Sequence, residues 1–346
     1  VEHIVDRCLA ESVLCVERWS EPDAVEEPIP LDGTTPRPFS VADSRPVVLG
    51  QDPEGKLRMD LAEALLTGLL DEAHAINSAG IVGGEKDGRA ALLLANQTPV
   101  YLANAGNTVG KVAALNNPDA NGIFQVVGTD TDGNSVLWDV AVDGTVLATT
   151  MLIDPQGLVF FADDINDAGS MGGRFWDAVN LVTGPAVGEF DGDGQLQLSP
   201  RANPNPSEID YIDKCHIDSL GNLLGDGGKT AAGGGHYARA VIWPDTDEAI
   251  ELAAEPGVIT AEGHGIASPG GVMQAVGGAS DGREWFAYIY TEGTMTNLES
   301  ISDGEQSWNF FMAYDISMSG MICGQGRVGS RRKFETHGFL LVPNSP

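Results

Sequence analysis

The sequence predicts an all-β fold built from repeated four-stranded antiparallel sheets, and three observations support this prediction. Glycine fills 44 of the 346 positions, nearly twice its usual share, and 42% of the residues are hydrophobic, enough for a sizeable core. A short turn motif recurs along most of the chain between apolar segments. Segments with helical spacing are short, whereas strand-like segments bounded by turn residues are common.

The repeated motif is an apolar residue, then Asn, Asp or Ser, two variable residues and Gly, followed by a hydrophobic residue and a second Gly. Its clearest copy runs from Ile76 to Gly83, with Asn77 and Gly80 at the turn positions. A side chain such as Asn accepts a backbone N–H bond there and Gly tolerates positive φ, so the motif predicts a tight hairpin. The second Gly permits a bulge or close backbone approach. The apolar anchors of the copies are Val41, Ile76, Leu115, Ile165, Ile217, Ile266 and Ile316.

Further strands follow each hairpin. Asp-Gly turns that begin at Asp87, Asp132 and Asp281 are strong hairpin signals. Apolar third strands are predicted at 90–94, 135–138, 240–243, 286–290 and 338–342. Weaker fourth strands near Val146, Ile250 and Leu298 complete units of about 40–50 residues, the size of a propeller blade.

These units predict one β-propeller domain over residues 1–346, with seven blades of four antiparallel strands. Six blades are the alternative, because the copy at Val41 is degenerate. The last copy ends at its third strand, so a strand from residues 1–30 is expected to close the last blade, with 12–18 beside 337–342. Closure would remove exposed sheet edges. The innermost strands are expected to begin near residues 73, 112, 163, 215, 264 and 314.

The repeat resembles the HAF repeat of bacterial extracellular proteins, which runs Ile-Asn-x-x-Gly-x-Val-Val-Gly and later His-Ala-Phe-Leu-Trp. The first half matches best at 76–83, at 165–172 and, with an insertion, at 115–128. The second half is echoed at 135–138, 240–243 and 337–341. The resemblance covers roughly residues 40–346 and implies a secreted, β-propeller-like protein. It implies no catalytic residues.

The charge of the chain limits its partners. Lys and Arg total 19 against 50 Asp and Glu, which gives a net charge of −31. Nucleic acid and anionic membranes are therefore excluded as main partners, because phosphate binding needs clustered cations. No apolar run is long enough to cross a membrane. The expected partner is a protein or polysaccharide of the cell surface or matrix, and the expected location is extracellular or on the cell surface.

Polar residues near the repeat anchors are candidate ligand-binding residues, because the first strand of each blade lines the central channel of a propeller. These candidates are His74, Asp164, His216, His264 and Tyr314. A ring of inward polar groups suits a metal or a small ligand. The alternative, which we favour, is that they fill space or bond neighbouring blades, since no blade has the strict ligand spacing that metals need.

A second candidate site is a calcium loop formed by Asp191, Asp193 and Gln195, whose alternating oxygen ligands around Gly resemble the start of such loops. It lies in what is expected to be the longest irregular region, roughly 184–210, after a copy near Gly173 that lacks a clear third strand. Calcium is therefore the candidate cofactor. No other cofactor is indicated.

Four cysteines allow several disulfide pairings. If the N-terminal strand joins the last blade, Cys8 or Cys15 is expected to reach Cys323, which leaves Cys215 free. A local bridge between Cys8 and Cys15 is the alternative.

No catalytic signature stands out, so the sequence favours a secreted, non-enzymatic binding or assembly module. One glycine-rich segment, from Gly225 to Thr230, superficially suggests a phosphate loop but is interpreted as a flexible hairpin loop. The first alternative function is a calcium-dependent hydrolase or lyase with its site on the propeller axis. The second is a structural subunit of a surface layer or filament.

Overall fold

The fold was analysed in a computed structural model of the chain. The structure describes residues 70–94, 99–102, 109–180, 182–205, 209, 211–230, 236–245, 248–252, 257–302, 308–330 and 333–343, and before residue 70 only short strands. The chain divides into two compact units, Thr67–Leu252 and Val1–Leu66 with Ala253–Pro346. Each unit is described by itself.

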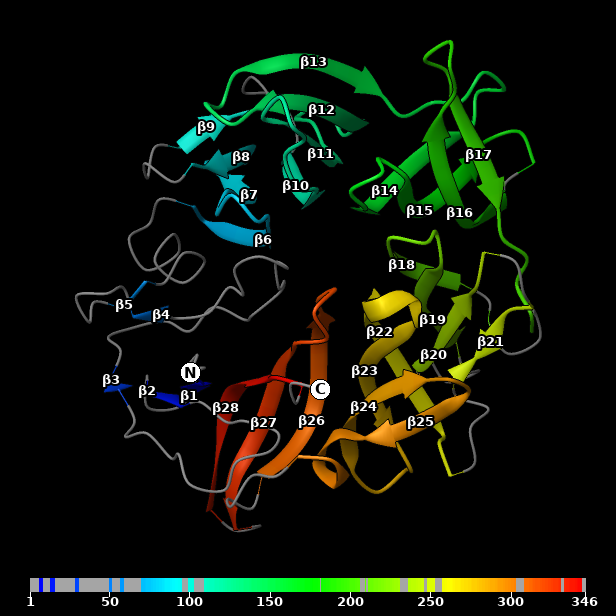
Figure 1. The fold of residues 1–346 in the computed structure, drawn as a ribbon. Coiled ribbons are helices and arrows are strands. Elements are labelled where there is room, and N and C mark those ends of the chain that lie inside the picture. The colour runs from blue at the N-terminus through cyan, green and yellow to red at the C-terminus, as the bar shows by residue number, and fades with distance from the viewer. Residues whose placement is uncertain are drawn as a thin grey trace. The chain divides into compact units, whose positions relative to one another are not determined.

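The unit Thr67–Leu252 contains four antiparallel sheets that follow one another along the chain (Figure 1). The first sheet has β6 (Glu72–Ile76), β7 (Val82–Lys86), β8 (Arg89–Leu93) and β9 (Pro99–Tyr101), and the second β10 (Lys111–Leu115), β11 (Ile123–Thr129), β12 (Ser135–Ala141) and β13 (Val146–Met151). The third has β14 (Val159–Ile165), β15 (Met171–Asp177), β16 (Val182–Phe190) and β17 (Leu196–Pro200), and the fourth β18 (Tyr211–Ile217), β19 (Leu223–Thr230), β20 (His236–Trp243) and β21 (Ile250–Glu251). All-β architecture with repeated four-stranded sheets is thus confirmed.

The other unit contains two further sheets. One has β22 (Thr260–Ala267), β23 (Gln274–Ser280), β24 (Trp285–Thr291) and β25 (Thr294–Asn297), with single 3₁₀ turns η2 (Pro269–Gly271) and η3 (Leu298–Ser300). The other has β26 (Trp308–Ile316), β27 (Ile322–Ser330) and β28 (Lys333–Leu341), extended by β1 (Asp6–Cys8), β2 (Val13–Cys15) and β3 (Ile29–Pro30). The short strands β4 (Gly50–Gln51) and β5 (Leu57–Arg58) pair with each other. The described helices are too short to cross a membrane.

N-terminal strands do join the last sheet, but not in the predicted order. The strand beside β28 is β1, with Cys8 opposite His337, and β2 lies one strand further out. The prediction that 12–18 lie beside 337–342 is therefore wrong by one strand. Cys215 and Cys323 are both free and buried, so the predicted bridge to Cys323 is absent, and burial raises the pKa of both thiols. The side chains of Cys8 and Cys15 lie outside the described residues.

The core of each unit lies between successive sheets. In the larger unit, β10 packs on the first sheet, β14 on the second and β18 on the third, so the first strand of each sheet always faces its predecessor. Figure 1 shows β10, β14 and β18 on the inner side of the successive sheets of this unit, and β13 and β17 on their outer side. Trp138, Phe124 and Leu92 fill the space between the first two sheets, and Phe160 and Met171 that between the next two.

All six predicted inner strands exist. β6 and β10 begin within one residue of the predicted positions, whereas β14, β18, β22 and β26 begin four to six residues earlier because they are longer. The expected irregular region is wrong, because β16 and β17, joined by a short turn, run through it and supply the third and fourth strands of their sheet. The segment from Gly225 to Thr230 is also not a loop but part of β19. The copy at Val41 lies outside the described residues.

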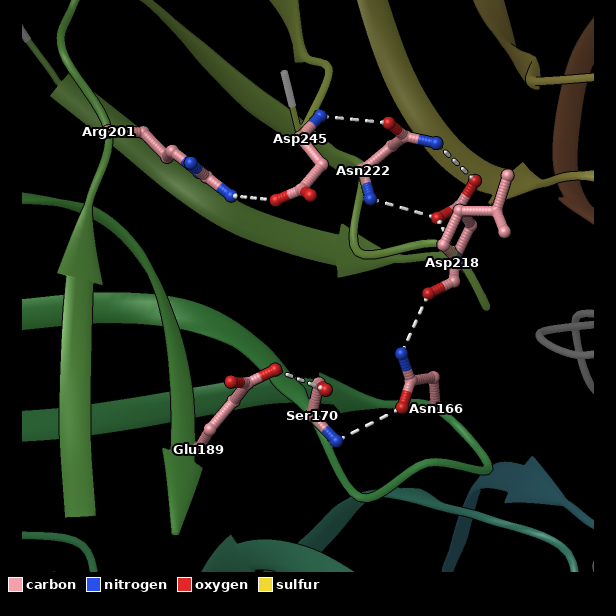
Figure 2. A network of polar contacts seen from close by, with 8 residues as sticks. Asn166, Ser170, Glu189, Arg201, Asp218, Asn222 and Asp245 are labelled. Carbon is pink, nitrogen blue, oxygen red and sulfur yellow. Dashed lines mark hydrogen bonds and ion pairs between the residues drawn. The ribbon is translucent and has the colours of Figure 1, made fainter. Parts of the chain in front are cut away.

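The predicted hairpin turns form, and their first residues also join neighbouring sheets. Asn166 Oδ1 accepts the N–H groups of Ala168 and Ser170, both at 3.0 Å, while its Nδ2 donates to the Asp218 carbonyl of the next sheet at 2.8 Å (Figure 2). Asn116 donates to the Asn166 carbonyl, and Asn77 to that of Asn116, each at 3.2 Å. The repeated turn residue is thus both a turn cap and a bond between sheets.

Candidate functional site

Every described first strand contains a β-bulge, at which one residue has no partner in the register with the second strand. The register skips one position in each of β6, β10, β14, β18 and β22 and two positions in β26. Bulges redirect side chains and often adjoin functional sites. The bulged residues recur with the period of the repeat and are His74, Ala113, Asp163, Asp213, His264, Phe311 and Tyr314.

A glycine on the second strand makes each bulge possible. A Cβ at Gly128 would collide with the carbonyl oxygen of Lys111, and one at Gly173 with that of Phe161. The same collision with a first-strand carbonyl recurs at Gly84, Gly227, Gly277 and Gly324. The predicted second-strand glycine has this role at Gly128, Gly277 and Gly324. At the other three bulges the colliding glycine lies one or two residues after the predicted Gly83, Gly172 and Gly225, so the prediction is confirmed only in part.

In the larger unit, an arginine joins the bulged residues of two successive sheets. Arg174 on β15 has its Nε 3.5 Å from Asp163 Oδ2 on β14 and its Nη1 3.7 Å from Asp213 Oδ1 on β18. Asp163 Oδ2 also accepts the N–H of Cys215 at 3.2 Å. Burial raises the pKa of Asp163 from 3.8 to about 6, although the Arg174 guanidinium and His216 oppose that shift.

Asp164, beside the bulge, ties β14 to β18. Its Oδ1 accepts the N–H of Ile165 at 2.8 Å, and its Oδ2 accepts the N–H of Ile217 at 3.0 Å. His216 Nδ1 lies 3.8 Å from the same carboxylate. The carboxylate therefore fixes the backbone of the next sheet, and a protonated His216 would form an ion pair with it.

His74, the bulged residue of β6, lies 3.1 Å from Glu72 through its Nε2. Burial lowers the pKa of His74, and the positive charges of Lys111 and Lys214 lower it further, whereas Glu72 raises it. The imidazole is therefore held neutral at pH 7, as a hydrogen-bonding group and not as a cation.

In the smaller unit, the bulges bring two rings together. The ring centroids of His264 and Tyr314 are 5.7 Å apart. His264 Nε2 lies 3.4 Å from Glu262 Oε2, and the Tyr314 hydroxyl donates to Gln325 Oε1 at 2.9 Å. Both rings are half-buried.

The structure thus brings together two pairs of the predicted candidates, Asp164 with His216 and His264 with Tyr314, within the two units respectively. His74 lies beside Glu72 and joins neither pair. Sequence reasoning missed Arg174 and Asp213 and did not separate Asp163 from Asp164. The signal was the bulge period, which becomes visible only when the strands are in register.

The predicted calcium loop forms a capped hairpin turn between β16 and β17. Asp191 Oδ1 accepts the N–H groups of Asp193 and Gln195, both at 2.9 Å, and its Oδ2 accepts from Gln197 at 2.8 Å. These contacts lower the pKa of Asp191, the Gln195 N–H above all. The same capping occurs at Asp130 and Asp154. Among the described residues, no three His, Cys, Asp or Glu side chains are grouped as metal ligands would be.

The free energy of unfolding is expected to depend on Asp163 in the acidic range. Its carboxyl, whose pKa rises from 3.8 to about 6, binds a proton more tightly in the folded state, so its contribution to stability grows as the pH falls through that pKa. Urea titrations at about pH 7.5 and about pH 5 measure how much the free energy of unfolding rises between these two pH values. The rise in the wild type should be about 1 kcal/mol larger than the rise in Asp163→Asn. Equal gains in the two proteins would show that Asp163 titrates normally.

No protein-family model matches the chain, and no curated protein matches its sequence. Among solved structures, it is similar to the β-propeller domain of the Trilobed protease from Pyrococcus furiosus, with 11% identity, a TM-score of 0.46 and coverage of 77% of this chain and 78% of that chain. It is also similar to Trypanosoma rangeli sialidase with the inhibitor DANA, with 9% identity, a TM-score of 0.42 and coverage of 83% of this chain and 56% of that chain. A third similar structure is an ulvan lyase from a new polysaccharide lyase family, with 11% identity, a TM-score of 0.41 and coverage of 77% of each chain. At these values the similarity says nothing about the activity or ligand of this chain.

Proposed function

We propose that the chain is a secreted or cell-surface binding module without enzymatic activity, whose ligand is a surface or matrix polysaccharide, with a surface protein as the alternative partner. The bulge in every described first strand carries this proposal. The bulge and the glycine opposite it recur in every sheet that has such a first strand, whereas the bulged residue differs, as in His74, Asp163 and Tyr314. Packing alone would favour one apolar residue at a repeated position, whereas partly exposed, chemically varied side chains suit recognition.

The same proposal includes a single β-propeller of seven blades, with six as the alternative, closed by residues 1–30. Two observations support it. Within each unit, the first strand of a sheet packs against the sheet that precedes it in the chain. The N-terminal strands extend the last sheet beyond β28. The HAF-like repeat and the extracellular location belong to this proposal as well.

The binding proposal can be tested by surface plasmon resonance of the full chain over immobilised dextran, xylan, chitosan and alginate. We expect binding to at least one polymer, weakened at least about tenfold by the double change His74→Ala and Asp163→Asn. Thr149→Ala, on the exposed outer strand β13, is the control and should bind as the wild type does. Absence of binding to every polymer, or equal binding by the double variant, would contradict the proposal.

A hydrolase or lyase is the second candidate, because one observation favours it. Asp163 combines a half-buried position, a pKa raised to about 6 and an adjacent guanidinium, a combination common at acid–base sites. The same polysaccharides can be incubated with the protein and assayed for new reducing ends and for unsaturated products. Product release that disappears in Asp163→Asn would identify an enzyme, and unchanged polymers support the binding module.

Calcium binding at Asp191, Asp193 and Gln195 remains part of the proposal, with a test that separates it from simple screening. Net charge −31 makes the folded chain repel itself, so sodium chloride should raise the melting temperature. At matched ionic strength, calcium should raise the melting temperature further if the loop binds the ion. At a hundredfold excess over the Kd, binding adds about 2.7 kcal/mol to the free energy of unfolding. Asp193→Ala should abolish that increment, and equal melting with and without calcium would reject the site.

A further inference from the structure

The strongest unassigned feature is the ring pair in the smaller unit. His264 on β22 and Tyr314 on β26 are both bulged residues of first strands, and their planes are tilted by 53° at a centroid distance of 5.7 Å. They do not belong to the hydrophobic core of this unit, which contains Phe310 and Phe339 at 4.5 Å.

Both rings are held in place by polar side chains of the same strands or their partners. The Tyr314 hydroxyl donates to Gln325, a buried residue of β27 with 8% exposure. His264 is oriented by Glu262, two residues earlier on β22. Rings fixed on strands lose little freedom when a ligand binds, so the pair is a preorganised surface.

The surroundings of the pair distinguish between kinds of ligand. A quaternary ammonium ion needs a box of several aromatic faces, but the face of Phe311, the other bulged residue of β26, is covered by the Arg327 guanidinium, 5.0 Å from its centroid. An anionic ligand would meet Glu262 and a chain with a net charge of −31. A neutral ligand with an apolar face and hydroxyl groups at its edge fits both the rings and the carboxylate beside them.

We infer that His264 and Tyr314 form a stacking site for the pyranose ring of a neutral saccharide, with the Glu262 carboxylate placed to meet its hydroxyl groups. The inference deepens the proposed binding module and rests on it. It assigns the saccharide contact to the strands β22 and β26, whereas the proposed-function test changes residues of the larger unit.

The test uses the full chain and the methyl glycosides of glucose, galactose, mannose and fucose, observed by saturation-transfer NMR and titration. We expect at least one neutral glycoside to bind, with saturation strongest at its ring C–H protons. Tyr314→Ala should weaken binding at least about tenfold, which is about 1.4 kcal/mol. Tyr314→Phe, which keeps the ring, should weaken it less, and Thr294→Ala on the exposed start of β25 should not change it.

Several outcomes would overturn the inference. These are no binding of any neutral glycoside, binding of tetramethylammonium or methyl glucuronide instead, or unchanged binding in both Tyr314→Ala and His264→Ala. Circular dichroism checks the folding of each variant, and His264→Ala decides if Tyr314→Ala does not fold. Polysaccharide binding that the double variant of the larger unit loses, but Tyr314→Ala retains, would overturn this site alone and leave the binding module in place.

Discussion

Replacing Gly128 by alanine is expected to lower the free energy of unfolding by about 2–3 kcal/mol, because the added methyl has no space. Its Cβ would meet the Lys111 carbonyl oxygen and the Val112 Cα, which are backbone atoms of the facing strand. Backbone atoms cannot move aside by a rotamer change, so the bulge in β10 must open or the two strands must separate. The melting temperature should fall by about 3–4 °C, because the unfolding entropy of a chain of 346 residues is large.

Gly192→Ala is the matched control for this experiment. Gly192 lies in the turn between β16 and β17, nothing lies within 4 Å of its would-be Cβ, and its φ is outside the positive range. The same methyl addition should therefore be neutral or stabilise by about 0.4–1 kcal/mol through the unfolded chain. Calorimetry of both variants decides. Equal melting temperatures would mean that the bulge does not need its glycine.

The contrast between the hairpins and the bulges shows what the sequence could predict. The turn at Asn166 is local, since the cap and the glycine lie within a few residues, and such turns were predicted correctly. The bulge depends on which residue of the second strand faces which residue of the first. That register is non-local, so Arg174 could not be assigned to Asp163 and Asp213 before the strands were paired.

The wrong prediction of an irregular region and the open alternative at Asp191 have the same origin. β16 contains Gly184, Pro185 and Gly188, which weaken a strand prediction. In the structure Pro185 precedes the stretch that pairs with β17, where a backbone donor would be required. The alternating oxygens at Asp191 likewise fit both a calcium loop and a capped turn, because the two share one local pattern.

The second large effect is expected at Asn166, whose amide joins two sheets. In Asn166→Asp the new carboxylate can still cap the turn, because Asp218 caps the corresponding turn of the next sheet with its own carboxylate, at 2.9 Å from the N–H groups of Leu220 and Asn222. What is lost is the N–H donor to the Asp218 carbonyl at 2.8 Å (Figure 2). An oxygen would then face an oxygen at a site with 8% exposure.

Leaving a buried acceptor unpaired opposite a charge should cost about 2–3 kcal/mol at neutral pH. The deficit should shrink in acid, because a protonated carboxyl regains an O–H donor. Asp154→Asn is the matched control, since Asp154 is similarly buried and caps a turn through Gln156 and Leu158, and should change the free energy of unfolding by less than about 0.5 kcal/mol. Urea titrations at about pH 7 and about pH 4.5 measure both variants. If Asn166→Asp is as stable as the wild type at neutral pH, the side-chain amides of Asn77, Asn116 and Asn166 do not hold the sheets together.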